Sequence, residues 1–242
     1  MTSAHKHIIF PLDVPTANLA LSLARMLAGH VGMFKVGLEL FISEGPDIVR
    51  RIMDETGAPV FLDLKLHDIP ETVRRAAKQV SCLGVAMVTV HCGESAAMLR
   101  AAVDGAGPDI KVLGVTVLTS VSGNDIGDSG FEARFRDNPI ELVVLRAEQA
   151  KKCGCAGVVC SGLEVARIKA AAGNDFLAIT PGIRPESAQK KKDDQKRVTT
   201  PAGAIKNGAD FLVIGRPIRD ADNPVSAADR IAEEIMSAFS SY

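Results

Sequence analysis

Aromatic residues are scarce in this chain of 242 residues: it has no tryptophan, one tyrosine (Tyr242), and Phe, Trp and Tyr together make up 4%. Proteins that bind single-stranded nucleic acid stack its bases on aromatic side chains. The formal net charge is −1, so the composition does not indicate a basic surface either. These two absences argue against a nucleic-acid-binding protein, and we expect no nucleic-acid partner.

The chain also lacks any apolar run long enough to cross a membrane, and residues 1–7 lead into a strand-like run without the hydrophobic region of a signal peptide. We therefore expect a soluble, cytoplasmic protein with no membrane partner. No Gly/Ser/Pro-rich linker or change in composition divides the sequence, so residues 1–242 are predicted to form one domain.

Cysteine occurs five times, and no pair has the Cys-x-x-Cys spacing of many metal and redox sites. The closest pair is Cys153 and Cys155, in a Cys-Gly-Cys sequence. We interpret these two residues as reduced cysteines at a helix end rather than as metal ligands.

Short apolar runs are abundant, and they alternate with helix-length amphipathic segments. One such segment covers residues 19–28 before Gly29, and another begins at Thr200-Pro201 and ends at Asn207-Gly208. Apolar strands joined by helices indicate a parallel sheet covered by helices, and eight units in about 250 residues predict a single-domain α/β protein with a (β/α)8 TIM barrel. An open doubly wound sheet is the alternative, but no Gly-x-Gly-x-x-Gly follows the first run. The eight runs are residues 8–12, 33–36, 60–64, 86–90, 112–118, 157–160, 177–180 and 211–214.

The third run continues to residue 66 and carries two opposite charges, Asp63 and Lys65. Their spacing of two places both side chains on one face of a strand. Buried charges are costly unless they are paired, so the pair indicates a polar site, although a salt bridge of purely structural role has the same pattern. Asp68 follows in the turn, and Pro70 is suited to the first turn of the next helix. We take this segment as the candidate active centre.

Other polar residues lie at the carboxyl ends of the predicted strands, where barrel enzymes carry their active sites. Each of them alone has a structural interpretation: Asp13 could cap a helix, and His91 could be a hydrogen-bonded histidine at the edge of the core. Their joint position at one rim is the evidence for a site. The residues are Asp13, Lys35, His91, Thr119, Ser120, Ser161, Arg184, Gly215 and Arg216.

The end of the last strand is predicted to bind phosphate. Gly215 lets the backbone approach a ligand closely, and Arg216 offers a planar guanidinium beside a helix start. Barrels often hold phosphate at the loops after strands seven and eight. Residues 184–197 are polar and without apolar periodicity, so they are either a solvated surface loop or a lid over that phosphate.

Together these motifs resemble the bacterial type of the orotidine 5′-phosphate decarboxylase family, from the first strand to the last. The matching segments are Leu12-Asp13, Phe34-Lys35-Val36-Gly37, the run from Phe61 to Pro70, Val90-His91, the run from Val115 to Ser120, the run from Thr180 to Arg184, and the run from Val213 to Pro217.

The resemblance implies conversion of orotidine 5′-monophosphate to uridine 5′-monophosphate and carbon dioxide in pyrimidine (UMP) biosynthesis, without a metal or an organic cofactor. It implies that Lys35, Asp63, Lys65 and Asp68 are catalytic, with Lys65 stabilising a carbanion at C6 and donating the proton. It also implies a homodimer in which Asp68, Ile69 and Thr72 complete the site of the partner chain. Substrate-binding residues would be Asp13, Lys35, Asp63, Thr72, Thr119, Arg184, Gln195, Gly215 and Arg216.

Two alternatives stay open at this point. Sugar-phosphate decarboxylases and aldolases of the same barrel superfamily share the Asp-x-Lys-x-x-Asp pattern but use magnesium, and they typically have glutamate where Lys35 stands here. A phosphate-binding barrel without catalytic activity is the second, because fold alone does not fix function. It would be expected to lack Asp63, Lys65 or Asp68, and all three are present.

Overall fold

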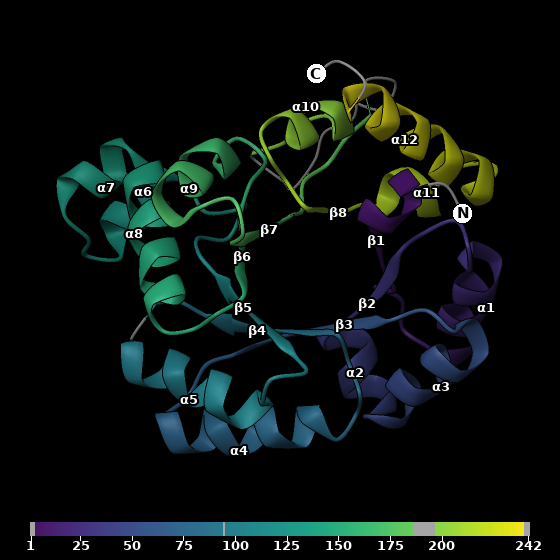
Figure 1. The fold of residues 1–242 in the computed structure, drawn as a ribbon, viewed down its shortest axis with the longest axis horizontal. Helices are drawn as coiled ribbons and strands as arrows, with labels where there is room; N and C mark the ends of the chain where they lie inside the picture. The colour runs from purple at the N-terminus through teal and green to yellow at the C-terminus, as the bar shows by residue number, and fades with distance from the viewer. Residues whose placement is uncertain (1–2, 94, 186–196, 240–242) are drawn as a thin grey trace.

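Eight parallel strands form a closed barrel with the strand order β1 to β8, as the alternation of apolar runs and helices predicts (Figure 1). The computed structural model describes residues 3–93, 95–185 and 197–239. Each strand pairs with the next one along the chain, and β8 pairs with β1 to close the ring. The strands are β1 (Ile8–Pro11), β2 (Met33–Gly37), β3 (Val60–Leu66), β4 (Met87–His91), β5 (Lys111–Val115), β6 (Gly157–Val159), β7 (Leu177–Thr180) and β8 (Phe211–Val213).

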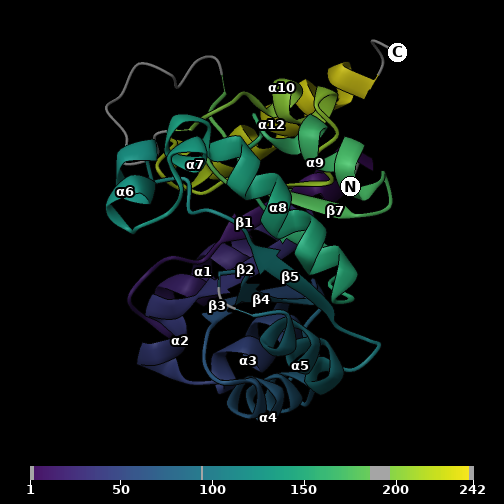
Figure 2. The same cartoon turned by 90° about the vertical axis from the view of Figure 1, so that its left-hand side faces the viewer.

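Helices surround the barrel as an outer ring (Figure 1). The long helix α8, seen from the side in Figure 2, contacts both β5 and β6. Among the described residues, no helix has both the length and the hydrophobicity to cross a membrane. The helices are η1 (Ser3–His7), α1 (Ala17–Leu27), α2 (Leu38–Glu44), α3 (Asp47–Thr56), α4 (Pro70–Ser81), α5 (Ala96–Ala106), α6 (Gly123–Asp128), α7 (Ala133–Asp137), α8 (Pro139–Lys152), α9 (Val165–Ala172), α10 (Pro201–Lys206), α11 (Arg216–Arg219) and α12 (Pro224–Phe239).

Hydroxyl caps and proline set several helix starts. Thr16 accepts a hydrogen bond from the backbone N–H of Leu19 at the start of α1, and Ser95 caps α5 in the same way. Thr200 caps α10 ahead of Pro201, as predicted, and Pro70 begins α4.

The apolar side chains form two separate clusters. The larger one fills the space between the outer faces of the strands and the helices. The smaller cluster contains one residue from each of six strands, so it fills the barrel interior. It lies beneath the polar residues at the rim. Its members are Ile9, Met33, Phe61, Met87, Leu113 and Ile179.

Some predicted boundaries were wrong. The fifth strand was expected to reach residue 118, but β5 ends at Val115, because the carbonyls of Val117 and Leu118 accept hydrogen bonds from Arg197 instead of extending the sheet. The first strand ends at Pro11 and the last at Val213, each one residue early. The first long helix covers Ala17–Leu27 rather than residues 19–28. The short helices α6 and α7 were not predicted.

Candidate active site

A cavity of about 300 Å³ opens at the carboxyl ends of the strands. Six of the predicted site residues line it: Asp13, Lys35, Asp63, Lys65, Thr119 and Ser120. These residues come from β2, β3 and the loops after β1 and β5. The remaining lining residues are apolar; they are Phe61, Val115, Val117, Leu118, Val159, Cys160, Pro181 and Val213.

Four of these side chains form a chain of alternating charge. The Lys35 ammonium donates to Asp13 Oδ1 at 2.9 Å and lies 3.4 Å from Asp63 Oδ2. The Lys65 ammonium donates to the same Asp63 oxygen at 2.8 Å. Asp63 therefore stands between two cations, which offsets the cost of burying three charges together.

The environment of Asp63 favours its ionised form. Burial alone would raise the pKa of this carboxyl, but the ammonium groups of Lys35 and Lys65 outweigh burial and hold the pKa below its usual range. The Thr89 hydroxyl also donates to Asp63 Oδ1 at 2.9 Å. Asp63 is thus a fixed negative charge at neutral pH, beside a cation that faces the cavity.

Strand β3 is not regular at this point. Lys65 has φ +51°, and among the described residues it is the only non-glycine residue with a positive φ. The pairing of β3 with β4 shifts between Leu62 and Leu66, and the Lys65 N–H donates to the Thr89 hydroxyl at 2.8 Å rather than to a strand carbonyl. The two-residue spacing of Asp63 and Lys65 therefore does not by itself explain their contact. A bulge in β3 also changes the direction of the Lys65 side chain.

Gly37 is a site residue that the sequence reasoning did not select. A Cβ atom at this position would lie 2.9 Å from both Asp13 Oδ1 and Lys35 Nζ, which is closer than real Cβ contacts. The absence of a side chain at Gly37 therefore makes room for the Asp13–Lys35 pair. A glycine at the end of a strand, two positions after the charged Lys35, was the sequence feature that could have indicated this role.

Two histidines lie close together, His67 directly after β3 and His91 at the end of β4. The rings of His67 and His91 have centroids 5.5 Å apart. Burial, together with the nearby His67 and Lys65, lowers the pKa of His91 from its usual value, so His91 is neutral at pH 7. Neither histidine lines the cavity, which fits the structural interpretation of His91.

The predicted phosphate-binding residues follow the neighbouring strands β7 and β8 and are not among the residues that line the cavity. Arg184 follows β7, and the exposed Arg216 begins α11 directly after Gly215. Gly215 also has a packing role, because a Cβ atom there would lie 2.9 Å from Pro11 Cγ. Gln195 falls outside the described residues.

Asp68, Ile69 and Thr72 do not reach the cavity of their own chain. All three are exposed, and the apolar side chain of Ile69 is 67% accessible. They occupy the turn after β3 and the first helical turn of α4, next to the charged end of β3. The geometry of the single chain thus assigns them no contact with the cavity.

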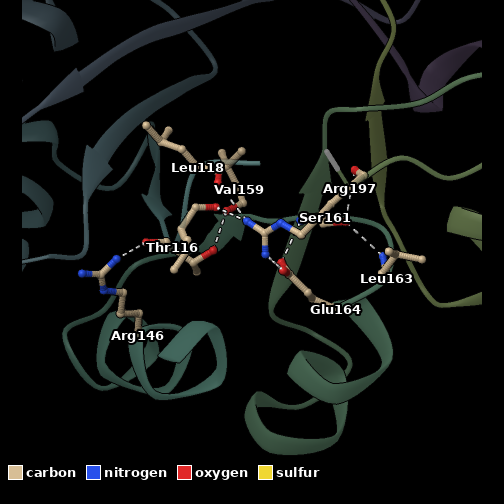
Figure 3. Close-up of polar contacts among 9 residues, drawn as sticks. Thr116, Leu118, Arg146, Val159, Ser161, Leu163, Glu164 and Arg197 are labelled. Atoms are coloured by element: carbon tan, nitrogen blue, oxygen red, sulfur yellow. Dashed lines mark hydrogen bonds and ion pairs between the residues drawn. The ribbon is translucent and has the colours of Figure 1, made fainter. Parts of the chain in front are cut away.

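A buried ion pair beside the cavity was also missed (Figure 3). Arg197 donates to the Glu164 carboxylate and, through Nη2, to the carbonyls of Val117 and Leu118 at 3.1 and 2.9 Å. Glu164 in turn accepts the backbone N–H of Ser161 at 2.9 Å. Burial raises the pKa of Glu164 even though Arg197 opposes the rise. This network fastens the loop that carries Thr119 to the loop after β6.

The fold and the rim define a (β/α)8-barrel enzyme with a charged Asp-x-Lys site on its third strand. The chain belongs to the Orotidine 5'-phosphate decarboxylase / HUMPS family, which matches residues 6–231. The orotidine 5'-phosphate decarboxylase of Desulfosudis oleivorans is 49% identical over 234 residues, which are 96% of this chain and 94% of that protein. The one of Anaeromyxobacter dehalogenans is also 49% identical and covers 94% of this chain and 97% of its own.

Solved structures agree with the family. The crystal structure of orotidine 5'-phosphate decarboxylase from Lactobacillus acidophilus superposes with a TM-score of 0.80 at 35% identity, covering 94% of this chain and 98% of that one. The enzyme from Pyrococcus horikoshii has a TM-score of 0.75 at 26% identity, with 95% and 99% coverage. The (β/α)8 expectation is therefore confirmed by fold and by relatives alike.

Proposed function

We propose that this protein decarboxylates orotidine 5′-monophosphate to uridine 5′-monophosphate and carbon dioxide, as a carboxy-lyase of pyrimidine (UMP) biosynthesis. The observation that carries the proposal is the Asp13–Lys35–Asp63–Lys65 chain, which lines the cavity with alternating charges. The names of its relatives support the substrate. A cytoplasmic location follows from the same assignment.

Lys65 is the proposed catalytic cation. Loss of carbon dioxide from C6 leaves a lone pair in the plane of the pyrimidine ring, where the ring π system cannot absorb it. The barrier then falls only if fixed charges stabilise the developing carbanion. The Lys65 ammonium faces the cavity, and after carbon dioxide leaves it transfers one N–H proton to C6.

Asp63 is proposed to hold Lys65 in place through their 2.8 Å contact and to stand next to the substrate carboxylate. Two like charges about 4 Å apart repel by roughly 1 kcal/mol in water and by more in a drier site, and the repulsion ends as carbon dioxide leaves. We rank this effect below the electrostatic role of Lys65. Asp13 and Lys35 would bind the ribose hydroxyls, and Thr119 the pyrimidine edge.

The phosphate is proposed to bind at Gly215 and Arg216, with Arg184 and Gln195 contributing from the segment after β7. Arg216 is exposed at a helix start, where its guanidinium can form charge-assisted hydrogen bonds with phosphate oxygens. The phosphate is remote from C6, so its binding energy orders the reacting end of the substrate rather than acting on the bond that breaks.

We further propose a homodimer with shared active sites. Asp68 and Thr72 are exposed although the family resemblance groups them with the site, and Ile69 presents a large apolar surface beside them. A second copy that covers Ile69 would bring Asp68 and Thr72 to the partner's cavity. Each active site would then contain Lys35, Asp63 and Lys65 of one chain and Asp68 of the other.

A magnesium-dependent reaction on a sugar phosphate is the second candidate, since the family includes more than one activity in its name. The donor set at the cavity disfavours it. The Lys35 ammonium already occupies the position between Asp13 and Asp63, where an acidic ligand would be needed to hold a divalent cation.

The decisive assay adds orotidine 5′-monophosphate to purified protein in excess chelator and follows the loss of the orotate chromophore and the appearance of uridine 5′-monophosphate by chromatography. We expect stoichiometric conversion. Turnover that begins only when magnesium is restored, or turnover of sugar phosphates alone, would replace the proposal by the second candidate.

A further inference from the structure

Three side chains that are distant in sequence meet at the amino-terminal end of the barrel. His5 comes from η1, His30 from the turn between α1 and β2, and Asp229 from α12. His5 Nε2 and His30 Nδ1 each lie 2.8 Å from the same oxygen, Asp229 Oδ1. Two imidazole nitrogens therefore converge on one point, the carboxylate oxygen of Asp229.

The geometry of the three groups suits a metal ion. One ligand atom from each residue lies within 4.8 Å of the others. The two imidazole rings are nearly perpendicular, at 81°, with centroids 6.2 Å apart, so they approach the point from different directions and do not stack. Zinc prefers imidazole and carboxylate ligands at about 2.0–2.2 Å in tetrahedral geometry, which requires this kind of convergence.

We propose that His5, His30 and Asp229 bind one zinc ion or a similar first-row divalent cation. Imidazole and carboxylate suit these metals, and the two histidines favour them over magnesium or calcium, which bind oxygen ligands. Three protein ligands leave the fourth position to water. That position faces solvent, because the side chains of His30 and Asp229 are 36% and 41% exposed while His5 is buried.

Binding would exchange hydrogen bonds for metal bonds. The nitrogens that face Asp229 must be unprotonated toward the ion, so each neutral imidazole carries its proton on its other ring nitrogen. Asp229 would bind the cation as a carboxylate, the deprotonated form that a metal ligand needs. Small rotations of the side chains open the 2.8 Å contacts to the wider spacing of metal ligands.

The site would act on stability rather than on the reaction. His5 precedes β1, while Asp13 follows it, so the cluster and the cavity lie at opposite ends of that strand. The ion would connect η1, the turn before β2 and α12, next to the seam where β8 pairs with β1. Ligands that bind only the folded state raise its stability by mass action.

The test is a titration of chelator-treated protein with zinc chloride by isothermal calorimetry, together with thermal unfolding with and without zinc. We expect one zinc per chain and a rise in Tm. His30→Ala and Asp229→Asn should weaken binding by at least about tenfold, as loss of metal-site groups does, and abolish the rise in Tm. His30 is the first choice because its partial exposure makes a folding defect less severe than at His5.

His7→Ala is the matched control. His7 lies on η1 with His5, but its ring contacts the carbonyl of Asp210 at 2.7 Å instead of the cluster, so the zinc affinity of this variant should equal that of the unchanged protein. Cobalt serves as a second probe, because its absorption spectrum reveals thiolate ligands such as the exposed Cys82. The proposal is overturned by absent binding, by binding that survives His30→Ala and Asp229→Asn in protein that melts cooperatively, or by a thiolate signature.

Discussion

Two carboxylates at the rim of the barrel, the half-buried Asp63 and the buried Glu164, differ in what surrounds them. Asp63 lies between two ammonium groups and lines the cavity, and its pKa is held below the usual range. Glu164 has one guanidinium partner and a backbone N–H, lies outside the cavity lining, and its pKa is raised by burial. The contrast separates charges that line the cavity, which we propose face the substrate, from charges that hold loops together.

The largest expected effect tests the cavity side of this comparison. Lys65→Ala should lower kcat by several powers of ten, because fixed charges that stabilise the transition state usually contribute more to catalysis than any other single effect. Lys169 is a matched control: its ammonium is also largely buried, in an ion pair with Asp210 at 2.7 Å, but it does not line the cavity. Lys169→Ala should reduce stability and leave kcat of the folded enzyme near its original value. Substantial turnover by Lys65→Ala would remove this residue from its proposed role.

The second prediction asks whether the cavity is completed by another chain. Mixing Asp68→Ala protein with Lys65→Ala protein should restore about a quarter of the original activity, since random exchange makes half of the dimers mixed and each mixed dimer has one native site. The measurement is steady-state activity after chain exchange, which native mass spectrometry verifies. Verified exchange without recovery would contradict shared sites.

Arg216→Ala should lower kcat/KM by about 10²–10³, because a charge-assisted phosphate contact is lost. Orotidine without its phosphate should be turned over equally by both proteins. Arg230→Ala is the control, since the exposed Arg230 donates to the Ser226 hydroxyl on its own helix α12 and is the neighbour of Asp229, at the other end of the barrel. An unchanged kcat/KM in Arg216→Ala would mean that the phosphate binds elsewhere.

The Glu164 side of the comparison predicts a loss of stability. Arg197→Ala should lower the free energy of unfolding by about 3–5 kcal/mol, because Glu164 remains as an uncompensated buried charge. Adding Glu164→Gln should recover part of the loss. Urea denaturation measures the free energy of unfolding of both variants. In steady-state kinetics, their loss of kcat/KM should be smaller than that of Arg216→Ala. A single-variant loss no larger than that of a surface change would refute the structural role.

The smallest effects are in the pH dependence, where the two carboxylates should have opposite signs. Asp63 has a pKa below the ordinary 3.8, so its stabilising contribution is complete above that pH and is lost as the pH falls through its lowered value. Glu164 has a pKa above the ordinary 4.5, so its destabilising charge is relieved as the pH falls through the raised value toward 4.5. The measurement is the free energy of urea unfolding as a function of pH for the unchanged protein, Asp63→Asn and Glu164→Gln. The difference between each variant and the unchanged protein gives the contribution of that carboxyl at each pH. Equal signs would show that the contrast between the two environments is wrong.

Much of the barrel was predictable from the sequence because each buried strand is a short apolar run. The polar rim was predictable for the same reason: Lys35, Asp63 and Lys65 interrupt or end such runs, where a charge needs an explanation. Strand ends were less accurate, as at β5, because the side chain of a distant residue, Arg197, takes up the carbonyls that would extend the sheet.

Contacts between distant residues that do not lie at the ends of predicted strands were not predictable. Glu164 and Arg197 are 33 positions apart, and His5 and Asp229 are 224 apart. Neither pair has a local pattern, since Glu164 looks like a helix cap and His5 like a polar residue before a strand. The positive φ of Lys65 was also not predictable from the sequence. At a non-glycine residue, such a conformation depends on the packing around β3 rather than on the local sequence.

That backbone means that the protein keeps its proposed catalytic cation at a position suited to glycine. A left-handed conformation costs an ordinary L-residue about 1–2 kcal/mol, while glycine adopts it freely. Lys65→Gly should thus fold at least as stably as Lys65→Ala while being equally inactive. Selection for turnover and selection for stability favour different residues at this position. In a related protein no longer selected for this activity, we expect Lys65 to be replaced early. Its replacement would then identify relatives that have lost the reaction.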